Sequence, residues 1–256
     1  MLFRSIRLTP GDKGFRIEPP PKAGGLEGLY TRMDTGIRPN AFGGTDFYAE
    51  MKSLYFEKGG LFSRSPPDTN SLAEFCKKDF EQCGTYTLGG GWFSLHDIEL
   101  VDANAEFGMF EREKVDFRRV GEALQISGDE WTKVAPVHGV RLDGTWGRFN
   151  ASSGMTATSS GGVASWETFV FKKDGTFERS GGNSVSSSNT SADTTTSIAG
   201  GNDRPAIQGT YAIDAYTLTL TAADGTIEKR SFYATDPNDL DLLIINGSNF
   251  TRDKKG

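Results

Sequence analysis

The sequence GTYAIDAYTLTLTAADGTIEKRSFYATDPNDLDLLIINGSNFT, residues 209–251, decides the fold class of this chain. Within it, Tyr216, Leu218 and Leu220 alternate with threonines, and this period of two places the apolar side chains on one face of a strand. An Asp-Gly and an Asn-Gly dipeptide follow, and both are favoured in tight β-hairpins. The stretch therefore predicts an antiparallel meander of short strands.

Composition extends this prediction to the whole chain of 256 residues, which has room for one large domain or two smaller ones. The 32 glycines exceed the usual share, and glycine-rich turns between aromatic and β-branched runs favour an all-β fold. A net charge of −6 argues against a broad grip on nucleic-acid phosphates. No nucleic-acid partner is expected.

The sequence also allows an expectation about the cellular location of the protein. No apolar run reaches the roughly 18 residues that a membrane span needs, and the first ten residues carry arginines where a secretory signal would be apolar. We therefore expect no membrane span and a cytoplasmic protein. The two cysteines, Cys76 and Cys83, do not form a disulfide framework and suit a reducing compartment equally well.

An internal repeat divides the chain. Four blocks recur in the same order, with offsets near 120 residues: LEGLYTR at 26–32 and LDGTWGR at 142–148, FEKGGLFSRS at 56–65 and FKKDGTFERS at 171–180, CGTYTL at 83–88 and QGTYAI at 208–213, and ISGDEWTK at 126–133 and INGSNFTR at 245–252. The repeat predicts three segments: an N-terminal hairpin and linker at 1–25, a first β module at 26–136 and a second at 137–256. A lone hairpin is marginal in water, so residues 1–25 must pack on the first module, on a partner or on a further domain.

The insertions between the blocks differ. Ser71 and Glu74 form a capping box, and the apolar residues after Ser71 recur at helical spacing, so we expect a short helix that covers one end of the first barrel. If that helix continues to Cys83, the cysteines lie about 10 Å apart along its axis, too far for a disulfide. In the second module, residues 180–203 are almost free of apolar side chains and are expected to be mobile, and the polar stretch 150–162 is expected to be a loop.

The matched blocks carry a Gly-x-Trp, a Phe-x-x-Asp-Gly-x-Phe hairpin, a Gly-Thr-Tyr and a terminal arginine, and in this they resemble the small bacterial lipocalin-like (calycin) barrel domains. The resemblance covers residues 26–253 and implies two tandem up-and-down antiparallel barrels. In that group the tryptophan packs at the closed barrel end against a basic residue of the last strand, which implies a pair of Trp146 with Arg252. Tyr30 and Lys133 are the corresponding, weaker pair in the first module. About eight strands fit each repeat, but separate closure and one shared sheet both remain open.

Residue patterns for chemistry are sparse. The two histidines, His96 and His138, are isolated, and the sequence lacks the usual nucleophile, phosphate-loop and zinc motifs. The acidic loop 236–241 has the oxygen ligands that calcium prefers but reads more simply as a solvated turn. Paired carboxylates on strands, such as Glu111 with Glu113 and Asp97 with Glu99, are expected on a wet face. We therefore predict no catalytic residues, no metal and no cofactor.

Arg64 and Arg179 occupy matched positions two residues beyond Phe62 and Phe177. If the two phenylalanines point into their barrels, the arginines share that side and could anchor an anion near the barrel mouth. The alternative is that both arginines are solvated at the rim.

These patterns indicate a non-enzymatic tandem β-barrel protein that serves either as an interaction or scaffold module or as a binder of a small ligand. The interaction reading places a protein partner on residues 1–25 or on the loops. The carrier reading places a small apolar or amphipathic molecule in a barrel cavity, since eight-stranded barrels are either filled by their own side chains or hold one ligand. A hydrolase that uses surface carboxylates is a remote third possibility.

Overall fold

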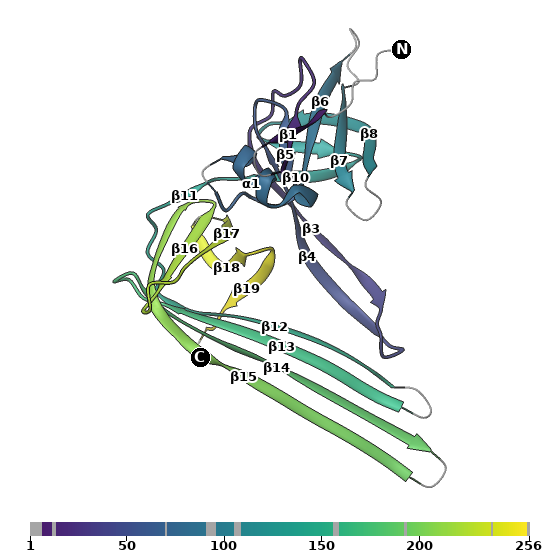
Figure 1. Cartoon of the computed structure of the whole chain (residues 1–256), viewed down its shortest axis with the longest axis vertical. Coiled ribbons are helices and arrows are strands. Elements are labelled where there is room, and N and C mark those ends of the chain that lie inside the picture. The colour runs from purple at the N-terminus through teal and green to yellow at the C-terminus, as the bar shows by residue number, and fades with distance from the viewer. Residues whose placement is uncertain are drawn as a thin grey trace.

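A computed structural model describes residues 7–254, except 12–13, 70, 91–95, 105–108, 156–158, 192–193 and 237. The described chain is all-β, with a single α-helix, α1 (Leu72–Lys78). Figure 1 shows a compact barrel near the N-terminus, a second curved sheet below it, and two long extensions, the hairpin of β3 and β4 and the four strands β12 to β15, that leave these bodies in a similar direction. The all-β prediction is confirmed.

The first body is a closed antiparallel barrel of eight strands in the order β10-β3-β4-β5-β6-β7-β8-β9. Its strands are β3 (Gly28–Pro39), β4 (Thr45–Phe56), β5 (Leu61–Ser63), β6 (Cys83–Gly90), β7 (His96–Asn104), β8 (Met109–Val120), β9 (Ala123–Ile126) and β10 (Asp129–Val134). The interior holds touching aromatic rings, with the Phe56 centroid 4.8 Å from Tyr86 and 6.0 Å from Phe62. All three side chains are fully buried, so the barrel is packed by its own residues at this level.

The second body is a nine-stranded sheet in the order β11-β15-β14-β13-β12-β19-β18-β17-β16. Its strands are β11 (Val137–His138), β12 (Gly144–Met155), β13 (Ser159–Phe171), β14 (Thr176–Ser191), β15 (Thr194–Ala215), β16 (Thr217–Ala222), β17 (Ile227–Asp236), β18 (Asp239–Ile245) and β19 (Ser248–Arg252). The additional pairing of β15 with β16 joins the sheet into a ring of eight strands, with β11 added outside on β15. The two sheets therefore close separately, each within its own half of the chain.

The polar insertions of the second module are strands rather than loops. Residues 180–203 belong to the hairpin of β14 and β15, and 150–162 to that of β12 and β13, apart from the few residues outside the described part. The prediction of loops was wrong because it counted only apolar burial. β13 and β14 satisfy their backbone groups on two neighbours over a dozen or more register positions, and β12 and β15 do so on one neighbour, so these ladders form without a core.

The two barrels carry the same hydrogen-bond set at the matched positions of the sequence. In the first, the Tyr86 hydroxyl accepts from the Leu26 amide at 2.7 Å and lies within hydrogen-bond distance of the Leu26 and Glu57 carbonyls. In the second, the Tyr211 hydroxyl accepts from the Leu142 amide at 2.7 Å and contacts the Leu142 and Lys172 carbonyls. The turns at 57–60 and 172–175 also match, since the Tyr86 amide donates to the Gly60 carbonyl and the Tyr211 amide to the Gly175 carbonyl.

Helix α1 begins as predicted, because the Ser71 hydroxyl accepts from the Glu74 amide and caps the first turn. Its position differs from the prediction. Its apolar residues pack with Leu61, Cys83 and Val101, whose strand neighbours Phe62 and Leu100 point into the barrel. The helix therefore covers the outer wall of β5, β6 and β7, and not a barrel end.

The cysteine prediction was wrong. Cys76 and Cys83 form a disulfide, with Cα atoms 5.6 Å apart. The helix ends at Lys78, and a 3₁₀ turn over Phe80–Gln82 folds the chain back before Cys83 opens β6. The separation of two helical turns that would have kept the thiols apart does not arise.

The N-terminal hairpin of β1 (Arg7–Gly11) and β2 (Gly14–Glu18) forms a separate two-stranded sheet. Of the alternatives left open by the sequence, the structure shows packing on the first module, where Ile17 is buried with Leu72, Phe75 and the disulfide. Residues 1–6 of the predicted N-terminal segment lie outside the described part of the chain.

A third apolar cluster joins the outer walls of the two barrels. It contains Leu29 and Val134 from the first, and Tyr216, Tyr233 and Ile244 from the second. The Tyr216 hydroxyl donates to the Val134 carbonyl at 2.9 Å, and its ring meets that of Tyr55 edge-on. Tyr216 therefore departs from the predicted common face, because it precedes β16 and turns outward while Leu218 and Leu220 enter the barrel core.

Candidate functional site

The end of the second barrel that holds Trp146 is sealed. The Arg252 guanidinium lies 5.2 Å from the centre of the Trp146 ring, and the two residues face each other across β12 and β19. The indole N–H donates to the Leu240 carbonyl at 2.7 Å, and Arg252 donates to the Asp143 carbonyl at 2.6 Å. Because the indole N–H and the guanidinium bond to carbonyls of the chain itself, these contacts stabilise the barrel end.

In the first barrel, Tyr30 and Lys133 are opposite each other on β3 and β10. Burial raises the pKa of the Tyr30 hydroxyl, which donates to the Glu27 carbonyl. A cation–π contact of this barrel comes instead from Arg32, whose guanidinium lies 5.5 Å from the Trp131 ring. The block comparison aligned Trp131 with Phe250 and so gave no reason to consider it.

Phe62 and Phe177 both lie in barrel cores, but the arginines that follow them have different surroundings. Arg64 lies beyond the end of β5, about half exposed, and makes a two-atom contact with the Asp102 carboxylate at 2.6 and 3.1 Å. Its position is the rim, and its charge is already matched by a carboxylate of this chain.

Arg179 lies deeper, within a charged layer above the core of the second barrel. It pairs with Glu228 at 2.7 Å, and Arg230 pairs with Glu228 at 2.7 Å and with Glu167 at 3.1 Å. Arg148 contacts Glu167 from the other side at 3.2 Å. Burial raises the pKa of Glu228, but Arg230 and Arg179 outweigh it and leave that pKa below its ordinary value. The layer is internally paired and lies above the rings of Phe169 and Phe250.

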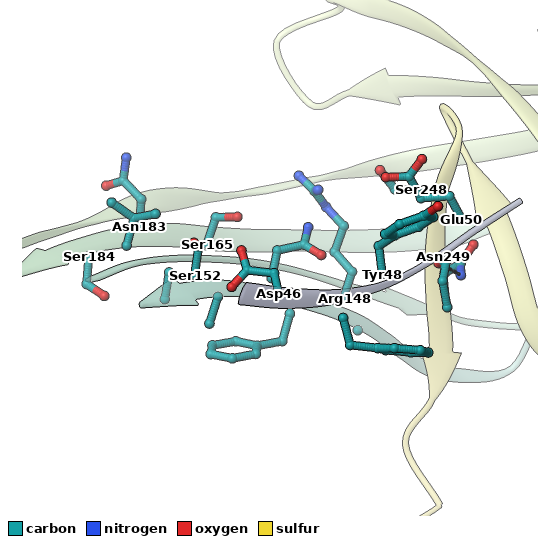
Figure 2. A pocket seen from close by; sticks show the side chains of 18 of the residues that line it. Asp46, Tyr48, Glu50, Arg148, Ser152, Ser165, Asn183, Ser184, Ser248 and Asn249 are labelled. Carbon is teal, nitrogen blue, oxygen red and sulfur yellow. Dashed lines mark hydrogen bonds between the residues drawn. The ribbon is translucent and has the colours of Figure 1, made fainter. Parts of the chain in front are cut away.

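A slot of about 1160 Å³ opens beside this charged layer, between the β3–β4 hairpin and the strands β12 to β15. We call it the interbarrel slot. Figure 2 shows its polar side chains, with Tyr48 and Arg148 reaching to the same side of their strands. Its wall residues are Arg38 and 46–50 from the hairpin, 147–152 from β12, 163–165 from β13, and parts of β14, β15 and β19. The volume is at or above the upper end of ordinary small-molecule pockets.

Two asparagines bridge the ends of the interbarrel slot. Near the hairpin tip, the Asn40 amide donates to the Ser153 carbonyl at 2.9 Å and to the Asp46 carboxylate at 2.8 Å. Near the barrels, the Asn249 amide donates to the Ala49 carbonyl at 3.1 Å. The Oδ1 atom of Asn249 is buried without a hydrogen-bond partner, and Asn249 lines the slot.

The contact between the tip of the β3–β4 hairpin and β12 includes the Asp46 carboxylate. Hydrogen bonds from Ser152 and then from Asn40 lower the pKa of the Asp46 carboxyl below its ordinary value. Phe42, at the turn of the hairpin, lies against Gly154 and Gly161, where an added Cβ would clash with its backbone or ring. Glycine at these two paired positions therefore lets the hairpin approach the sheet closely.

The acidic loop 236–241 and the two histidines were also considered as sites from the sequence. Asp236 and Asp239 accept from the amides two residues later, and Asp241 pairs with Lys254 at 2.6 Å. The His138 ring lies 2.7 Å from Asp214 on the exposed pairing of β11 with β15. For His96 the backbone is described, in β7, but not the side chain. Within the described ranges, no group of three or more histidine, cysteine or acidic side chains is arranged to hold a metal ion.

Of the predicted site residues, the structure brings Trp146 to Arg252 and places Arg179 near the slot, whereas Arg64 lies on the other barrel. Sequence reasoning missed the interbarrel slot, because the run of Ser, Thr, Asn and Gly in 180–203 indicates the lack of a core and not the neighbours of these strands. Among the described residues, no helix has the length and apolar character for a membrane crossing. Comparisons with protein-family models, curated proteins and solved structures gave no match to this chain.

Proposed function

We propose that this chain is a non-enzymatic interaction module that holds a partner in the interbarrel slot. The proposal rests on where the open volume lies. Both barrel cores contain touching aromatic rings, whereas the slot of about 1160 Å³ lies outside the barrels. The apolar contact between the barrels supports the proposal, because it packs the bodies that carry the two walls of the slot against each other.

We also infer that the two barrels are copies of one lipocalin-like unit. The support is the repeated hydrogen-bond set around Tyr86 and Tyr211, together with the four matched sequence blocks. In such a duplication the shared parts maintain the fold, and the parts that differ are free to acquire a binding role. The hairpin β3–β4 corresponds to β12–β13, and the long strands β14 and β15 differ most, since their counterparts β5 and β6 are short.

The carrier alternative, a small apolar molecule inside a barrel, has less support. In the second barrel the Phe171 ring lies 4.8 Å from Tyr211 and 5.3 Å from Phe169, and the charged layer of Arg179 and Glu228 lies above them. An apolar ligand would have to displace packed rings and separate paired charges, both of which cost free energy.

The disulfide changes the compartment that we propose. Disulfides persist in oxidising surroundings and are rare in the reducing cytosol. Cys76 and Cys83 are buried in one cluster with Ile17 and Phe75, so the bond is part of the packing of the N-terminal hairpin. We therefore favour an oxidising compartment over the cytoplasm expected from the sequence.

Site-specific photo-crosslinking tests the proposed function. A benzophenone amino acid at Tyr48 lies in the slot, and the same group at the exposed Arg118 on β8 is the matched control. In an extract of its own source, the Tyr48 variant should form adducts with a polypeptide while the Arg118 variant does not. Equal adducts at both positions, or an intact mass that reveals a bound apolar molecule with no adduct at Tyr48, would contradict the proposal.

A further inference from the structure

Two strands expose an unpaired edge to the interbarrel slot. β4 pairs with β3 along its full length but with β5 only at Tyr55 and Phe56. β12 pairs with β13 along its full length but with β19 only at Trp146 and Gly147. In the described part of the chain, the remainder of each strand therefore has one edge without a neighbouring strand.

The slot is lined by residues 46–50 of β4 and 147–152 of β12, which belong to the parts of these strands without a neighbour on one edge. Residues 163–165 of β13 and 183–185 of β14, which are paired on both edges, also line it. The direction of the backbone groups of β4 and β12 therefore has to come from their hydrogen bonds.

The hydrogen bonds fix which backbone groups point into the slot. The Ala49 carbonyl accepts from Asn249, and the Ser153 carbonyl accepts from Asn40, so both are directed away from their paired strands. The Thr145 carbonyl points to the same edge of β12, where it accepts from the Asp253 amide. Since backbone groups alternate in direction along a strand, Phe47 and Ala49 on β4, and residues 149 and 151 on β12, present their N–H and C=O groups to the slot.

We propose that the interbarrel slot accepts an extended polypeptide segment as an additional strand, hydrogen-bonded to β4 on one side and to β12 on the other. The inference rests on the proposed function and specifies its partner. Main-chain hydrogen bonds would provide the affinity, as in other cases of strand addition. The two asparagine bridges hold the walls in place around the segment.

The walls also specify the chemistry of the segment. Figure 2 shows Tyr48 and Arg148 on the same side of their strands, and alternation places Phe47 and Phe149 on the opposite side, where they are 72% and 68% exposed. A strand inserted between them would alternate in the same way. The segment is therefore amphipathic, with polar side chains facing Tyr48 and Arg148 and apolar side chains facing the two phenylalanines.

Peptide selection followed by backbone methylation tests the proposal. Phage-displayed random peptides of about nine residues, long enough for one strand, are selected on the full chain. Selected peptides should alternate polar and apolar residues. N-methylation at every second residue, in either of the two phases, should weaken binding about tenfold or more, because one phase removes donors to β4 and the other removes donors to β12.

The outcomes separate this inference from the proposed function. If only one methylation phase weakens peptide binding, the peptide adds to a single edge. If neither phase weakens binding, the peptide is recognised through its side chains. Either result overturns the proposal of a strand bonded to both β4 and β12, while crosslinking at Tyr48 would still occur. Selection of no peptide, or concentration-dependent dimerisation of the chain through the slot, also overturns it. The variant Ala151→Pro removes one slot-facing N–H and should weaken binding about three- to tenfold with an unchanged melting temperature, since proline is tolerated on strand edges. If that variant unfolds, the methylated peptides still decide the question.

Discussion

Tyr86 and Tyr211 lie at matched positions in the two barrels and make the same three hydrogen-bond contacts, whereas the long extension of β14 and β15 has no counterpart in the short strands β5 and β6 of the first barrel. The first barrel extends only β3 and β4, and the second extends four strands from Gly144 to Ala215. This difference indicates that the buried barrel parts of the strands determine the fold, and that the parts extending beyond the barrels form the proposed binding site. Variants that act on one part and not the other can break or sharpen this comparison.

The largest effect is expected at the buried end of the second barrel. Trp146→Ala removes a side chain that is fully buried beneath Arg252 and should lower the free energy of unfolding by about 3–5 kcal/mol. Denaturant titration measures the loss. Phe149→Ala, an exposed aromatic three residues along the same strand, is the matched control and should change stability by less than about 0.5 kcal/mol. A loss below about 1 kcal/mol for Trp146→Ala would contradict the role assigned to this barrel end.

The two buried tyrosines provide a matched pair of smaller size. Tyr86→Phe and Tyr211→Phe each leave a buried amide without its acceptor and remove the single hydroxyl proton that lies between two carbonyls, and each should cost about 2–3 kcal/mol. Both variants are compared by denaturant titration under identical conditions. Costs that differ by more than about 1 kcal/mol would show that the two hydrogen-bond sets are not energetically equivalent.

The disulfide should have a local effect. The double variant Cys76→Ser with Cys83→Ser releases a short loop and should cost about 2–3 kcal/mol in the chain-entropy estimate. Hydrogen exchange should increase in α1 and β2, which share its cluster, and remain unchanged in β12 to β15. Faster exchange in β12 to β15 would mean that the extensions depend on the disulfide cluster, against the separation of fold and site.

The smallest effect is expected at the hairpin tip. The pKa of Asp46 lies below its ordinary 3.8 in the folded chain, so its contacts stabilise the tip above that pH and are lost as the pH falls through the lowered value. The amide resonances of Ser152 and Ser153 should report this loss during an acid titration. Asp46→Asn should remove the transition, and Asp224→Asn, which alters a distant turn carboxylate whose pKa is also lowered, should leave it in place. Persistence of the transition in Asp46→Asn would exclude this carboxylate as its source.

The local features of the fold could be predicted from the sequence, whereas few of its long-range contacts could. Alternation in residues 217–222 and the capping residues Ser71 and Glu74 are local signals, and strand β16 and helix α1 follow them. The end of the helix at Lys78 was not readable from spacing alone, so the disulfide was excluded wrongly. A helix end depends on the competition between one more turn and the packing of the next strand.

The interbarrel slot could not be predicted because it has no contiguous sequence. Asn40 and Ser153 are 113 positions apart, and Asn249 and Ala49 are 200 positions apart. Such contacts depend on how two barrels pack, through residues such as Tyr216 whose outward turn departs from the strand pattern. The polar composition of 180–203 indicated only the lack of a core, and a backbone ladder needs none.

Residue-resolved amide exchange of the full chain, with and without a bound peptide, tests the central claim most directly. The account predicts that the amides of Ala49 and Ala151 exchange rapidly in the free chain and become protected on binding, while those of Tyr48 and Asn150, which face β3 and β13, are protected in both states. Protection that appears instead within a barrel core or along the outer edge of β15, with Ala49 and Ala151 unchanged, would contradict the claim that the interbarrel slot is the binding site.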